Sequence, residues 1–484
     1  MREYDAVLQE IADYVLAGSI QSEEAYRTAR LALMDATACA LMALGKPECT
    51  KLIGPIIPGT QVPQGVRVPG TPHVLDPVQG AFAITALIRW LDYNDTWLAK
   101  EWGHPSDNLG SLLAAADYVS QQRRRYGEKP YSIRDLLTAM IQAYEIQGVL
   151  ALEVSLNRRG FDHVHFVKVA SAAVAARLLG GGREEVLSAL SHAFIDGAAL
   201  RTYRHFPNTG PRKSWAAADA TSRAMRLALF AVMGESGYPT ALTAPTWGFE
   251  AVVMGGHPVR LARPLGSYVM ENVLFKVSYP AEFHGQTAVE AALRLHSQVK
   301  SRLEEIESIL IETQESAVRI IDKPGPFRNP ADRDHSLQYM TAAALVYGEL
   351  TYAHYEEPIA SDPRLAALIS RMQVRENPEF SRDYLDPEKR SIANSIQIQF
   401  KDGTFTEKIV VEYPVGHRRR RAEAIPLLRE KFATALRLVY PEQKASSIYQ
   451  LVAESPSFEE VAVDTFLGLL AHPGEGIRYG RLAS

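Results

Sequence analysis

The stretch Val169-Ala-Ser-Ala-Ala-Val-Ala-Ala-Arg177 combines an apolar helical pattern with a high density of small side chains. Alanine has the highest helix propensity of the amino acids, and small side chains let neighbouring helices approach closely. The stretch therefore predicts a central helix of an α-helical domain, over about residues 164–179. Similar apolar periodicity predicts further helices at 77–97, 133–156, 184–200 and 214–234.

The N-terminal residues continue this helical pattern until prolines interrupt it. Apolar residues at four-residue spacing predict a first helix that ends at Gly18. A second helix is expected to begin after Ser22, because a serine hydroxyl can accept a hydrogen bond from the first turn, and to run toward Gly45. Repeated prolines exclude long helices from residues 47–77, so we expect an extended loop there.

The pattern changes after about residue 270. Alternation around Ile309 predicts a strand, and Lys401-Asp-Gly-Thr404 between two β-rich runs predicts a hairpin. Helical segments at 284–298 and 335–349 lie between these strands. The sequence therefore predicts a mostly α protein with an α+β second domain. We expect residues 273–415 to form this α+β domain and residues 416–484 to pack back on the helical domain of residues 1–272, which would make that domain discontinuous.

Composition argues against nucleic acid and membrane as partners. The 484 residues carry a formal net charge of −4, whereas nucleic-acid binding needs a basic surface. The run Arg418–Arg421 is a local feature, because Glu423 and Glu430 follow it. The start of the chain has no apolar signal core, and no stretch of about 18 uncharged apolar residues could span a bilayer. We expect a cytoplasmic protein.

The cysteine count and one glycine-rich stretch argue against thiolate-bound metal sites and a phosphate loop. The chain has two cysteines, Cys39 and Cys49, too few for a cubane iron–sulfur cluster or a zinc ribbon. Gly180-Gly-Gly182 has no Lys-Ser/Thr after it, so it predicts a turn between helices and not a phosphate loop.

The segment Asp92-Tyr-Asn-Asp-Thr-Trp97 through His104 to Asp107 is unusually rich in polar and aromatic side chains. If the preceding helix continues this far, Asp92 and Thr96 share one of its faces. His104 precedes a proline and is therefore expected in extended backbone, which suits a residue facing a pocket. The alternative interpretation is a helix cap followed by surface polar groups.

A second cluster is basic: Arg201-Thr-Tyr-Arg204-His and Arg212-Lys213 lie in a loop before a helix that Ser214 could cap. Helix N-termini and guanidinium groups both bind carboxylates. The alternative is a solvated basic loop.

Three further residues are ambiguous alone. His163-Val-His165 has the composition of a metal pair, but residues at i and i+2 of a helix point apart. Lys276 lies in an apolar stretch, either as a surface group or as a buried lysine. Tyr339 follows Asp332-Arg-Asp-His335, which is equally typical of a salt-bridged helix start.

Long passages of the sequence resemble the MmgE/PrpD family over nearly the whole chain. The passages that carry this resemblance are Lys51–Thr60, Arg89–Trp97, Glu101–Gly110, Ala199–His205, Gly210–Ala217, Met270–His284 and Asn329–His335. The resemblance implies a homodimer, an active site between the two domains, and no metal or organic cofactor.

The resemblance also implies which residues form the site. Residues of the cis-aconitate decarboxylase branch of the family match seven positions here: Asp92, Thr96, His104, His163, Lys213, Lys276 and Tyr339. One extra residue separates Thr96 from His104 in this chain, as in the dehydratase branch, which favours a dehydratase.

The implied reaction is elimination of water from 2-methylcitrate to give 2-methyl-cis-aconitate, in propionate breakdown, with citrate as a further substrate. Such an elimination needs a base for the proton and an acid for the hydroxyl. We expect His104, oriented by Asp92, to be one of them, and His163 or Lys276 to be the other. Tyr339 is expected to hydrogen-bond the leaving hydroxyl or a carboxylate. The residues expected to bind the substrate carboxylates are Arg201, Arg204, Lys213 and His284.

Two alternatives remain at this point. A sister activity, decarboxylation or epimerisation of a similar acid, would use the same residue types. A helical binding protein without turnover would also keep such a pocket, although the complete set of seven residues argues against it.

Overall fold

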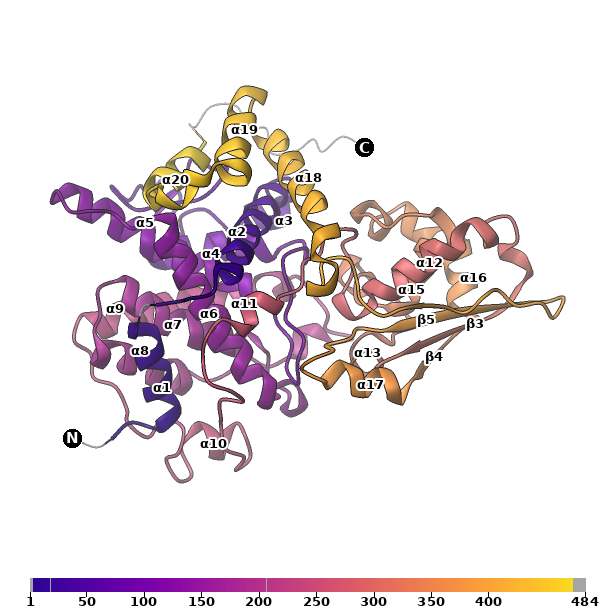
Figure 1. Cartoon of the computed structure of the whole chain (residues 1–484), viewed down its shortest axis with the longest axis horizontal. Helices are drawn as coiled ribbons and strands as arrows, with labels where there is room; N and C mark the ends of the chain where they lie inside the picture. Colours follow the sequence, from indigo (N-terminus) through magenta and orange to yellow (C-terminus); the bar gives the residue numbers. More distant parts are fainter. Residues whose placement is uncertain (1–2, 18, 206, 473–484) are drawn as a thin grey trace. The chain divides into compact units, whose positions relative to one another are not determined.

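The computed structural model describes residues 3–17, 19–205 and 207–472. It is helix-rich with a small sheet, as the sequence predicts. The chain divides into two compact units (Figure 1). Unit 1 comprises Met1–His205, Arg212–Leu274 and Ile425–Ser484, and unit 2 comprises Phe206–Pro211 and Phe275–Ala424.

Unit 1 is built from helices, with one small hairpin of strands β1 (Val66–Arg67) and β2 (Val74–Leu75). Its helices are α1 (Ala6–Ala17), α2 (Glu23–Ala43), α3 (Pro47–Thr50), α4 (Pro77–Arg89), α5 (Leu109–Arg125), α6 (Ile133–Glu153), α7 (Val164–Leu178), α8 (Arg183–Ile195), α9 (Arg212–Val232), α10 (Phe249–Val252), α11 (Tyr268–Asn272), most of α18 (Arg421–Val439), α19 (Glu442–Tyr449) and α20 (Val463–Leu470). The first turn of α18 belongs to unit 2.

Helix α7 is the central helix that its alanines predict. It packs against α6, α8 and α9, while α4 packs against α9 and α5 (Figure 1). Every residue of α7 from Val164 to Ala176 is buried. Small side chains on α7 and α9 allow this close approach, so the expectation for residues 164–179 is confirmed.

Helix starts follow the predicted capping chemistry at some positions and differ at others. The Ser22 hydroxyl accepts from the backbone N–H of Ala25 at 3.1 Å, as predicted. Ser214 does not cap a helix, because α9 already begins at Arg212 and Ser214 lies within its first turn. The expected end of the first helix, Gly18, lies outside the described residues.

The helix predicted over residues 77–97 is too long. Asp76 caps α4 by accepting from two backbone N–H groups, but the helix ends at Arg89. Asp92 has φ +50°, a left-handed conformation that no right-handed helix contains. Asp92 and Thr96 therefore do not share a helix face, and that expectation was wrong.

Residues 47–77 contain no long helix, in agreement with the prolines. The prediction of a plain loop missed two elements, the one-turn helix α3 and the β1–β2 hairpin. Pro47 occupies the first position of α3, where its missing N–H is not needed.

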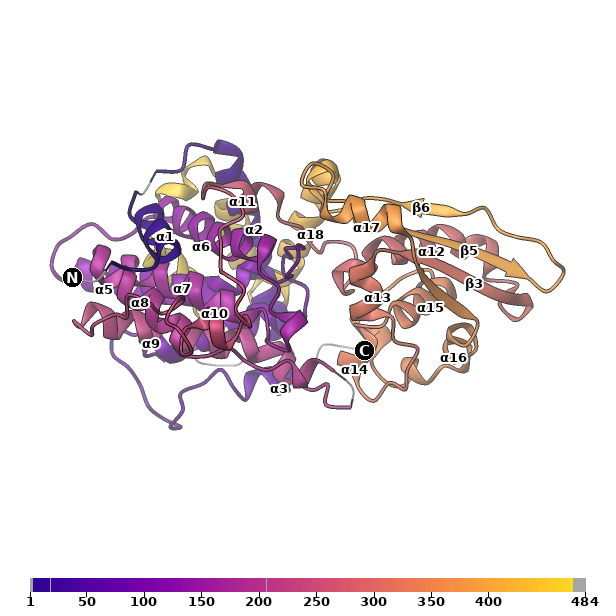
Figure 2. The ribbon, with the colours of Figure 1, turned by 90° about the horizontal axis from the view of Figure 1, so that it is seen from below.

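Unit 2 contains a four-stranded sheet in the order β4-β3-β5-β6. Its strands are β3 (Ile306–Thr313), β4 (Met372–Glu376), β5 (Asn394–Phe400) and β6 (Ile409–Val411). Figure 2 labels three of these strands, β3, β5 and β6. The predicted strand and hairpin are both present, because β3 contains Ile309 and β5 pairs antiparallel with β6. Strand β4 was not predicted; it pairs parallel to β3, and its residues are exposed or half-buried, so it lacks a clear apolar alternation.

Helices pack on this sheet and complete the core of unit 2. They are α12 (Gln286–Val299), α13 (Glu315–Ile321), α14 (Pro330–Arg333), α15 (Leu337–Tyr347), α16 (Pro363–Ile369) and α17 (Pro378–Leu385). Helix α12 contacts β5 and β6, and α15 packs on α12. The apolar core includes Ile309, Ile311, Ile396 and Ile398, which recur at every second residue along their strands.

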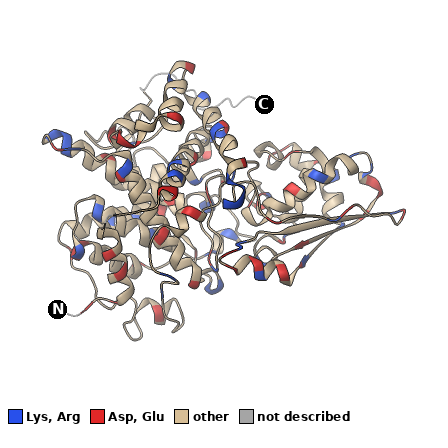
Figure 3. Cartoon of the chain, in the orientation of Figure 1, with Lys and Arg blue, Asp and Glu red and all other residues tan. Residues whose placement is uncertain are grey.

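Basic and acidic residues alternate along the ribbon of both units (Figure 3). This distribution agrees with the nearly equal numbers of 52 basic and 56 acidic residues. Among the described residues, no helix is both long and apolar enough to cross a bilayer.

Candidate active site

The segment of residues 92–107, here called the acidic segment, is a buried loop between α4 and α5. Two backbone hydrogen bonds join Trp97 and Gly103 across its turn, at 2.8 and 3.0 Å. Thr96 pairs in the same way with Leu274. Because nearly all of its residues are buried, the alternative of a cap with surface polar groups does not describe it.

The ring of His104 is held by the backbone of the acidic segment. Its Nδ1 lies 2.7 Å from the carbonyl oxygen of Asp95 and 3.4 Å from the Thr96 hydroxyl. A carbonyl oxygen can only accept, so Nδ1 carries the hydrogen and Nε2 holds the lone pair when the ring is neutral. His104 has extended backbone, with φ −123° and ψ 97°, as its position before proline predicts.

The carboxylate of Asp92 faces Nε2 of His104, at 3.5 Å. It also lies 2.8 Å from Arg89 Nη1 and 4.0 Å from Lys213 Nζ. All four side chains are buried. The carbonyl oxygen of Asp95 therefore fixes Nδ1 of the His104 ring. The Asp92 carboxylate lies beside Nε2, the nitrogen expected to exchange a proton.

The carboxyl groups of Asp95 and Asp107 stabilise the acidic segment through hydrogen bonds. Asp95 accepts from the Tyr144 hydroxyl at 2.6 Å and from the backbone N–H of Ser106 at 2.9 Å. Asp107 accepts from the Asn94 amide at 3.1 Å. Burial raises the pKa of Asp95 to about 6 and that of Asp107 to about 7. The sequence prediction did not assign these roles, because Tyr144 lies 49 residues away from Asp95.

His163 lies beside His104, with ring centroids 6.1 Å apart. Its Nδ1 is 3.2 Å from Asp162, which also binds Arg204 through two guanidinium nitrogens. Burial opposes the charge on Asp162, but Arg204, His163 and Arg201 outweigh it and hold the pKa of this carboxyl well below its usual range. Burial lowers the pKa of His163 well below that of a free histidine.

Several buried nitrogens in this cluster have no aligned hydrogen-bond acceptor among the described residues. They include both ring nitrogens of His163 and Nη1 of Arg201, whose guanidinium lies 5.5 Å from the Trp102 ring. Arg201 is 6% exposed. Buried donors normally find partners, so these groups indicate a place for a polar ligand. The alternative of a solvated basic loop does not describe Arg201, Arg204 or Lys213, because all three are buried.

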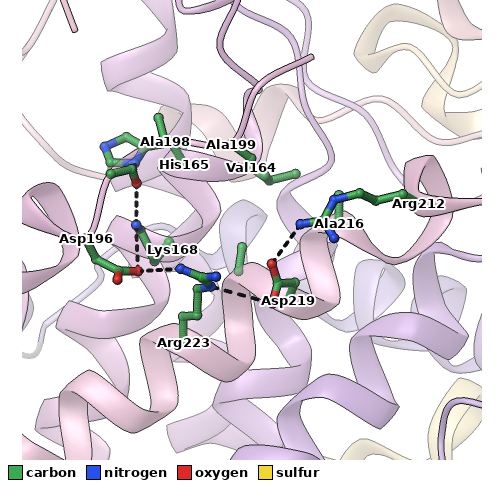
Figure 4. Close-up of a pocket in the computed structure, with 12 residues that line it drawn as sticks. Val164, His165, Lys168, Asp196, Ala198, Ala199, Arg212, Ala216, Asp219 and Arg223 are labelled. Atoms are coloured by element: carbon green, nitrogen blue, oxygen red, sulfur yellow. Dashed lines mark hydrogen bonds and ion pairs between the residues drawn. The ribbon is translucent and has the colours of Figure 1, made fainter. Parts of the chain in front are cut away.

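The neighbouring histidine, His165, faces a separate pocket of about 200 Å³ between α7 and α9 (Figure 4). Its ring stacks on Phe249 and its Nδ1 contacts the Gly197 carbonyl at 3.2 Å. The prediction that His163 and His165 point apart is confirmed. Lys168 and Arg223 in this pocket both pair with Asp196, so its charges largely neutralise one another.

In unit 2, Lys276 is buried, which decides between its two interpretations. Burial raises the pKa of Glu282, but the charges of His284 and Lys276 outweigh burial and lower this pKa to about 2. His284 lies between two partners, Glu282 at 2.9 Å from Nδ1 and the Tyr384 hydroxyl at 3.2 Å from Nε2. Both ring nitrogens of this expected substrate ligand are therefore engaged within unit 2.

Tyr339 lies in the core of unit 2, on α15. Its hydroxyl donates to the carbonyl oxygen of His354 at 2.6 Å, and its ring meets Phe327 edge-on. Burial raises its pKa to about 12. Because the hydroxyl proton is already donated, the oxygen lone pairs are what Tyr339 can offer to another group.

The structure thus brings together seven of the predicted residues in unit 1 and places three in unit 2. The unit 1 set is Asp92, Thr96, His104, His163, Arg201, Arg204 and Lys213, and the unit 2 set is Lys276, His284 and Tyr339. Sequence reasoning missed Arg89, Asp95, Asp162 and Tyr144 as parts of the unit 1 cluster.

Two models of protein-family domains match the chain. Residues 9–262 match the MmgE/PrpD N-terminal domain, and residues 279–455 match the MmgE/PrpD C-terminal domain. The two matches together cover most of the chain. The chain belongs to the MmgE/PrpD family.

Its relatives in the MmgE/PrpD family are similar over their full length. The chain is 55% identical to 2-methylcitrate dehydratase of Escherichia coli strain K12 over 470 residues, which are 96% of this chain and 97% of the relative. The same identity and coverage are found for 2-methylcitrate dehydratase of Cupriavidus necator. The mitochondrial 2-methylcitrate dehydratase of Yarrowia lipolytica is 52% identical over 96% of this chain and 90% of the relative.

The cysteines of this MmgE/PrpD chain do not form a metal-binding set. Cys39 and Cys49 are both buried, and burial raises the pKa of the Cys39 thiol to about 12 and that of Cys49 further. A thiol must lose its proton to bind a metal, so these two residues do not fit a thiolate-bound cluster.

Proposed function

We propose that this chain is a 2-methylcitrate dehydratase, a hydro-lyase of propionate catabolism. It would eliminate water from 2-methylcitrate to give 2-methyl-cis-aconitate and would also convert citrate to cis-aconitate. The proposal is supported by relatives of this name that are 55% identical over 96% of the chain.

One structural observation carries the proposal: the cations and unpaired donors buried around His104 and His163. The buried cations here include Arg89, Arg201, Arg204 and Lys213, and two of them, Arg89 and Arg204, pair with Asp92 and Asp162. A tricarboxylate brings about three negative charges at neutral pH. Its carboxylates would supply acceptors for the buried nitrogens of Arg201 and His163.

The proposed elimination is a proton transfer followed by loss of hydroxide as water. A base takes the proton from the carbon next to a carboxylate, the electron pair forms the new double bond, and an acid protonates the departing hydroxyl. We assign His104 Nε2 to one of these two transfers and His163 to the other. Asp92 beside Nε2 stabilises the ring when it is protonated. Cations at the neighbouring carboxylate stabilise the charge that develops on it.

The residues of unit 2 keep their predicted roles as part of this proposal. Lys276 would supply a further positive charge or act as the alternative to His163 in proton transfer. Tyr339 would offer its oxygen to the leaving hydroxyl or to a carboxylate. His284 would contribute to substrate binding through the network that it forms with Glu282.

A direct assay tests the proposal. Protein treated with a chelator is offered 2-methylcitrate, its stereoisomers, citrate and cis-aconitate in separate reactions, and the products are identified by mass spectrometry. We expect 2-methyl-cis-aconitate from one or more stereoisomers of 2-methylcitrate. Loss of activity on chelation would contradict a cofactor-free reaction, and release of carbon dioxide from cis-aconitate would show a decarboxylase instead. Absence of any turnover with normal ligand binding would show a binding protein.

We also propose a homodimer that works in the cytoplasm, with residues 273–415 as an inserted lid domain between 1–272 and 416–484. The matches at 9–262 and 279–455 support two domains with a boundary near residue 270. Light scattering of the purified protein is expected to give twice the chain mass of 53.5 kDa. A mass equal to one chain would contradict the homodimer.

A further inference from the structure

A buried lysine, Lys431 on α18, contacts the acidic segment without belonging to the proposed set of reacting groups. Its Nζ lies 2.6 Å from Asp35 Oδ1 on α2 and 2.6 Å from the backbone carbonyl oxygen of Tyr93. The same ammonium lies 3.6 Å from the centre of the Tyr93 ring. Lys431 is 7% exposed and Asp35 is 1% exposed. All three residues belong to unit 1.

Stability alone is a poor explanation for this pair. Taking two charges out of water costs several kcal/mol per ion, and replacing a buried ion pair by apolar side chains of similar size is often neutral or stabilising. Burial disfavours the charged lysine, yet the neighbouring Asp35 raises its pKa, so Lys431 stays protonated. An apolar pair would lose the contacts of the ammonium with the carbonyl oxygen and the ring of Tyr93.

That carbonyl belongs to the backbone next to Asp92. Asp92 has a left-handed backbone, with φ +50°, which is uncommon for residues other than glycine and needs support from its surroundings. Its carboxylate lies 3.5 Å from Nε2 of His104. A contact that fixes the Tyr93–Asn94 peptide therefore limits how the Asp92 carboxylate can move relative to the His104 ring.

We propose that Lys431, neutralised by Asp35, is a positioning residue: it holds the Tyr93 carbonyl and so keeps Asp92 against His104 Nε2. Lys431 itself contacts no reacting atom. The consequence for turnover rests on the proposed dehydratase function, whereas the consequence for the backbone of residues 92–107 does not.

The test removes both charges together. The double variant Lys431→Met with Asp35→Leu leaves no unpaired buried charge, so we expect its thermal unfolding to stay at or above that of the parent. We expect kcat for 2-methylcitrate to fall about 10- to 100-fold, because a displacement of about 1 Å can have that effect. KM should change by less than about threefold, since the cations that bind carboxylates are retained. A purely structural pair would instead change unfolding and leave kcat of the folded protein intact.

Backbone hydrogen exchange gives a readout that does not depend on the substrate. In the double variant, amides of residues 92–107 should exchange faster, while those of α7 keep the parental rate. If the parent does not turn over 2-methylcitrate, the proposed function is wrong and the exchange measurement alone decides the positioning role. Parental exchange at residues 92–107 would overturn that role, as would parental kcat in an active protein.

Two further variants keep the test decisive. Lys444→Met is a matched control, because Lys444 also binds a backbone carbonyl and lies 4.7 Å from a tyrosine ring. Its carbonyl partner, Ala471 at 3.0 Å, follows the end of α20 and lies outside the acidic segment. It should leave kcat and exchange at residues 92–107 unchanged.

If the double variant does not fold, Asp35→Asn replaces it, with a smaller loss of kcat expected. Parental kcat and exchange in Asp35→Asn would then overturn the proposal.

Discussion

Histidines in the two units differ in what surrounds them. In unit 1, neither ring nitrogen of His163 has an aligned hydrogen-bond acceptor among the described residues, and His104 has one nitrogen fixed by a carbonyl and the other facing Asp92. In unit 2, His284 is engaged on both sides, by Glu282 and Tyr384. The proposed function uses the unit 1 histidines for proton transfer, whereas His284 is held in a hydrogen-bond network within unit 2.

Burial alone does not distinguish these three histidines. His104, His163 and His284 are all buried. They differ in their partners: Nε2 of His163 has no hydrogen-bond partner among the described residues, Nε2 of His104 faces Asp92 at 3.5 Å, and both ring nitrogens of His284 are hydrogen-bonded. Under the proposed mechanism, substitutions in the unit 1 cluster should affect turnover most, and those in unit 2 should act partly through stability.

The largest effect is expected for His104→Gln. Removing a group that transfers protons typically costs about 10²- to 10⁴-fold in rate, so kcat should fall about 1,000-fold. Glutamine keeps an amide that can donate to the Asp95 carbonyl, and thermal unfolding should stay near that of the parent. Steady-state kinetics with 2-methylcitrate measures the loss; near-parental turnover would remove His104 from the mechanism.

A large effect on stability is expected for Asp162→Asn. The change leaves the buried guanidinium of Arg204 without its ionised partner, which typically costs about 3–5 kcal/mol. Glu153→Gln is the control, because it breaks the Lys100–Glu153 pair, whose side chains are half exposed, and should cost less than about 1 kcal/mol.

Tryptophan fluorescence during urea unfolding can measure both changes. All five tryptophans lie in unit 1, so the signal follows that unit alone; they are Trp90, Trp97, Trp102, Trp215 and Trp247. Equal losses of stability for Asp162→Asn and Glu153→Gln would contradict the special role of the Asp162–Arg204 pair.

A pH effect is expected from Asp107. Burial raises its pKa to about 7 from the ordinary value of 3.8, so between those limits the folded state binds more protons than the unfolded state. Its contribution to stability therefore falls as pH rises through this window. Asp107→Asn should remove a slope of at most about 1.4 kcal/mol per pH unit.

Urea unfolding at several pH values between 4 and 7 measures this slope. Glu10→Gln, on the exposed face of α1, should leave it as in the parent. An unchanged slope in Asp107→Asn would show that this carboxyl is ionised throughout the window.

The smallest effect is expected for Tyr339→Phe. It removes the hydrogen bond to the His354 carbonyl, worth about 1 kcal/mol, and the oxygen that the proposed mechanism uses. We expect kcat to fall about tenfold. Tyr347→Phe is a matched control on the same helix, because its hydroxyl binds Asp362. Parental kcat in Tyr339→Phe would show that Tyr339 contributes to the core of unit 2 and not to turnover.

Local features of this fold could be predicted from sequence because neighbouring residues determine them. The cap at Ser22, the strand around Ile309, the β5–β6 hairpin and the extended backbone at His104 all depend on a few adjacent side chains. The helix end at Arg89 was missed because Leu91 and Leu98 continue the helical spacing of Leu87, although the residues between them are mostly polar. Strand β4 was missed because its pairing with β3, and not an apolar face, defines it.

Long-range contacts in the candidate site had no comparable local signal. Residue types at Asp92, His104 and Lys213 were predicted from the resemblance, and so was the proximity of Asp92 to His104, but the contacts of Asp92 with Arg89 and of His104 with the Asp95 carbonyl were not. Arg204 meets Asp162 across 42 residues, and Lys431 meets Tyr93 across 338. Nothing in the residues around Asp162 or Lys431 indicates such partners, because only the packing of α7, α9 and α18 brings them together.

The left-handed backbone of Asp92 has a consequence for how substitutions at this position must be designed. Asparagine tolerates that backbone well, so Asp92→Asn changes the charge and keeps the loop conformation. Alanine and glutamate adopt it less readily, and those variants would combine a change of charge or length with a change of chain path. A conventional alanine scan would therefore overstate the chemical contribution of this carboxylate, whereas the asparagine and glycine variants separate charge from conformation.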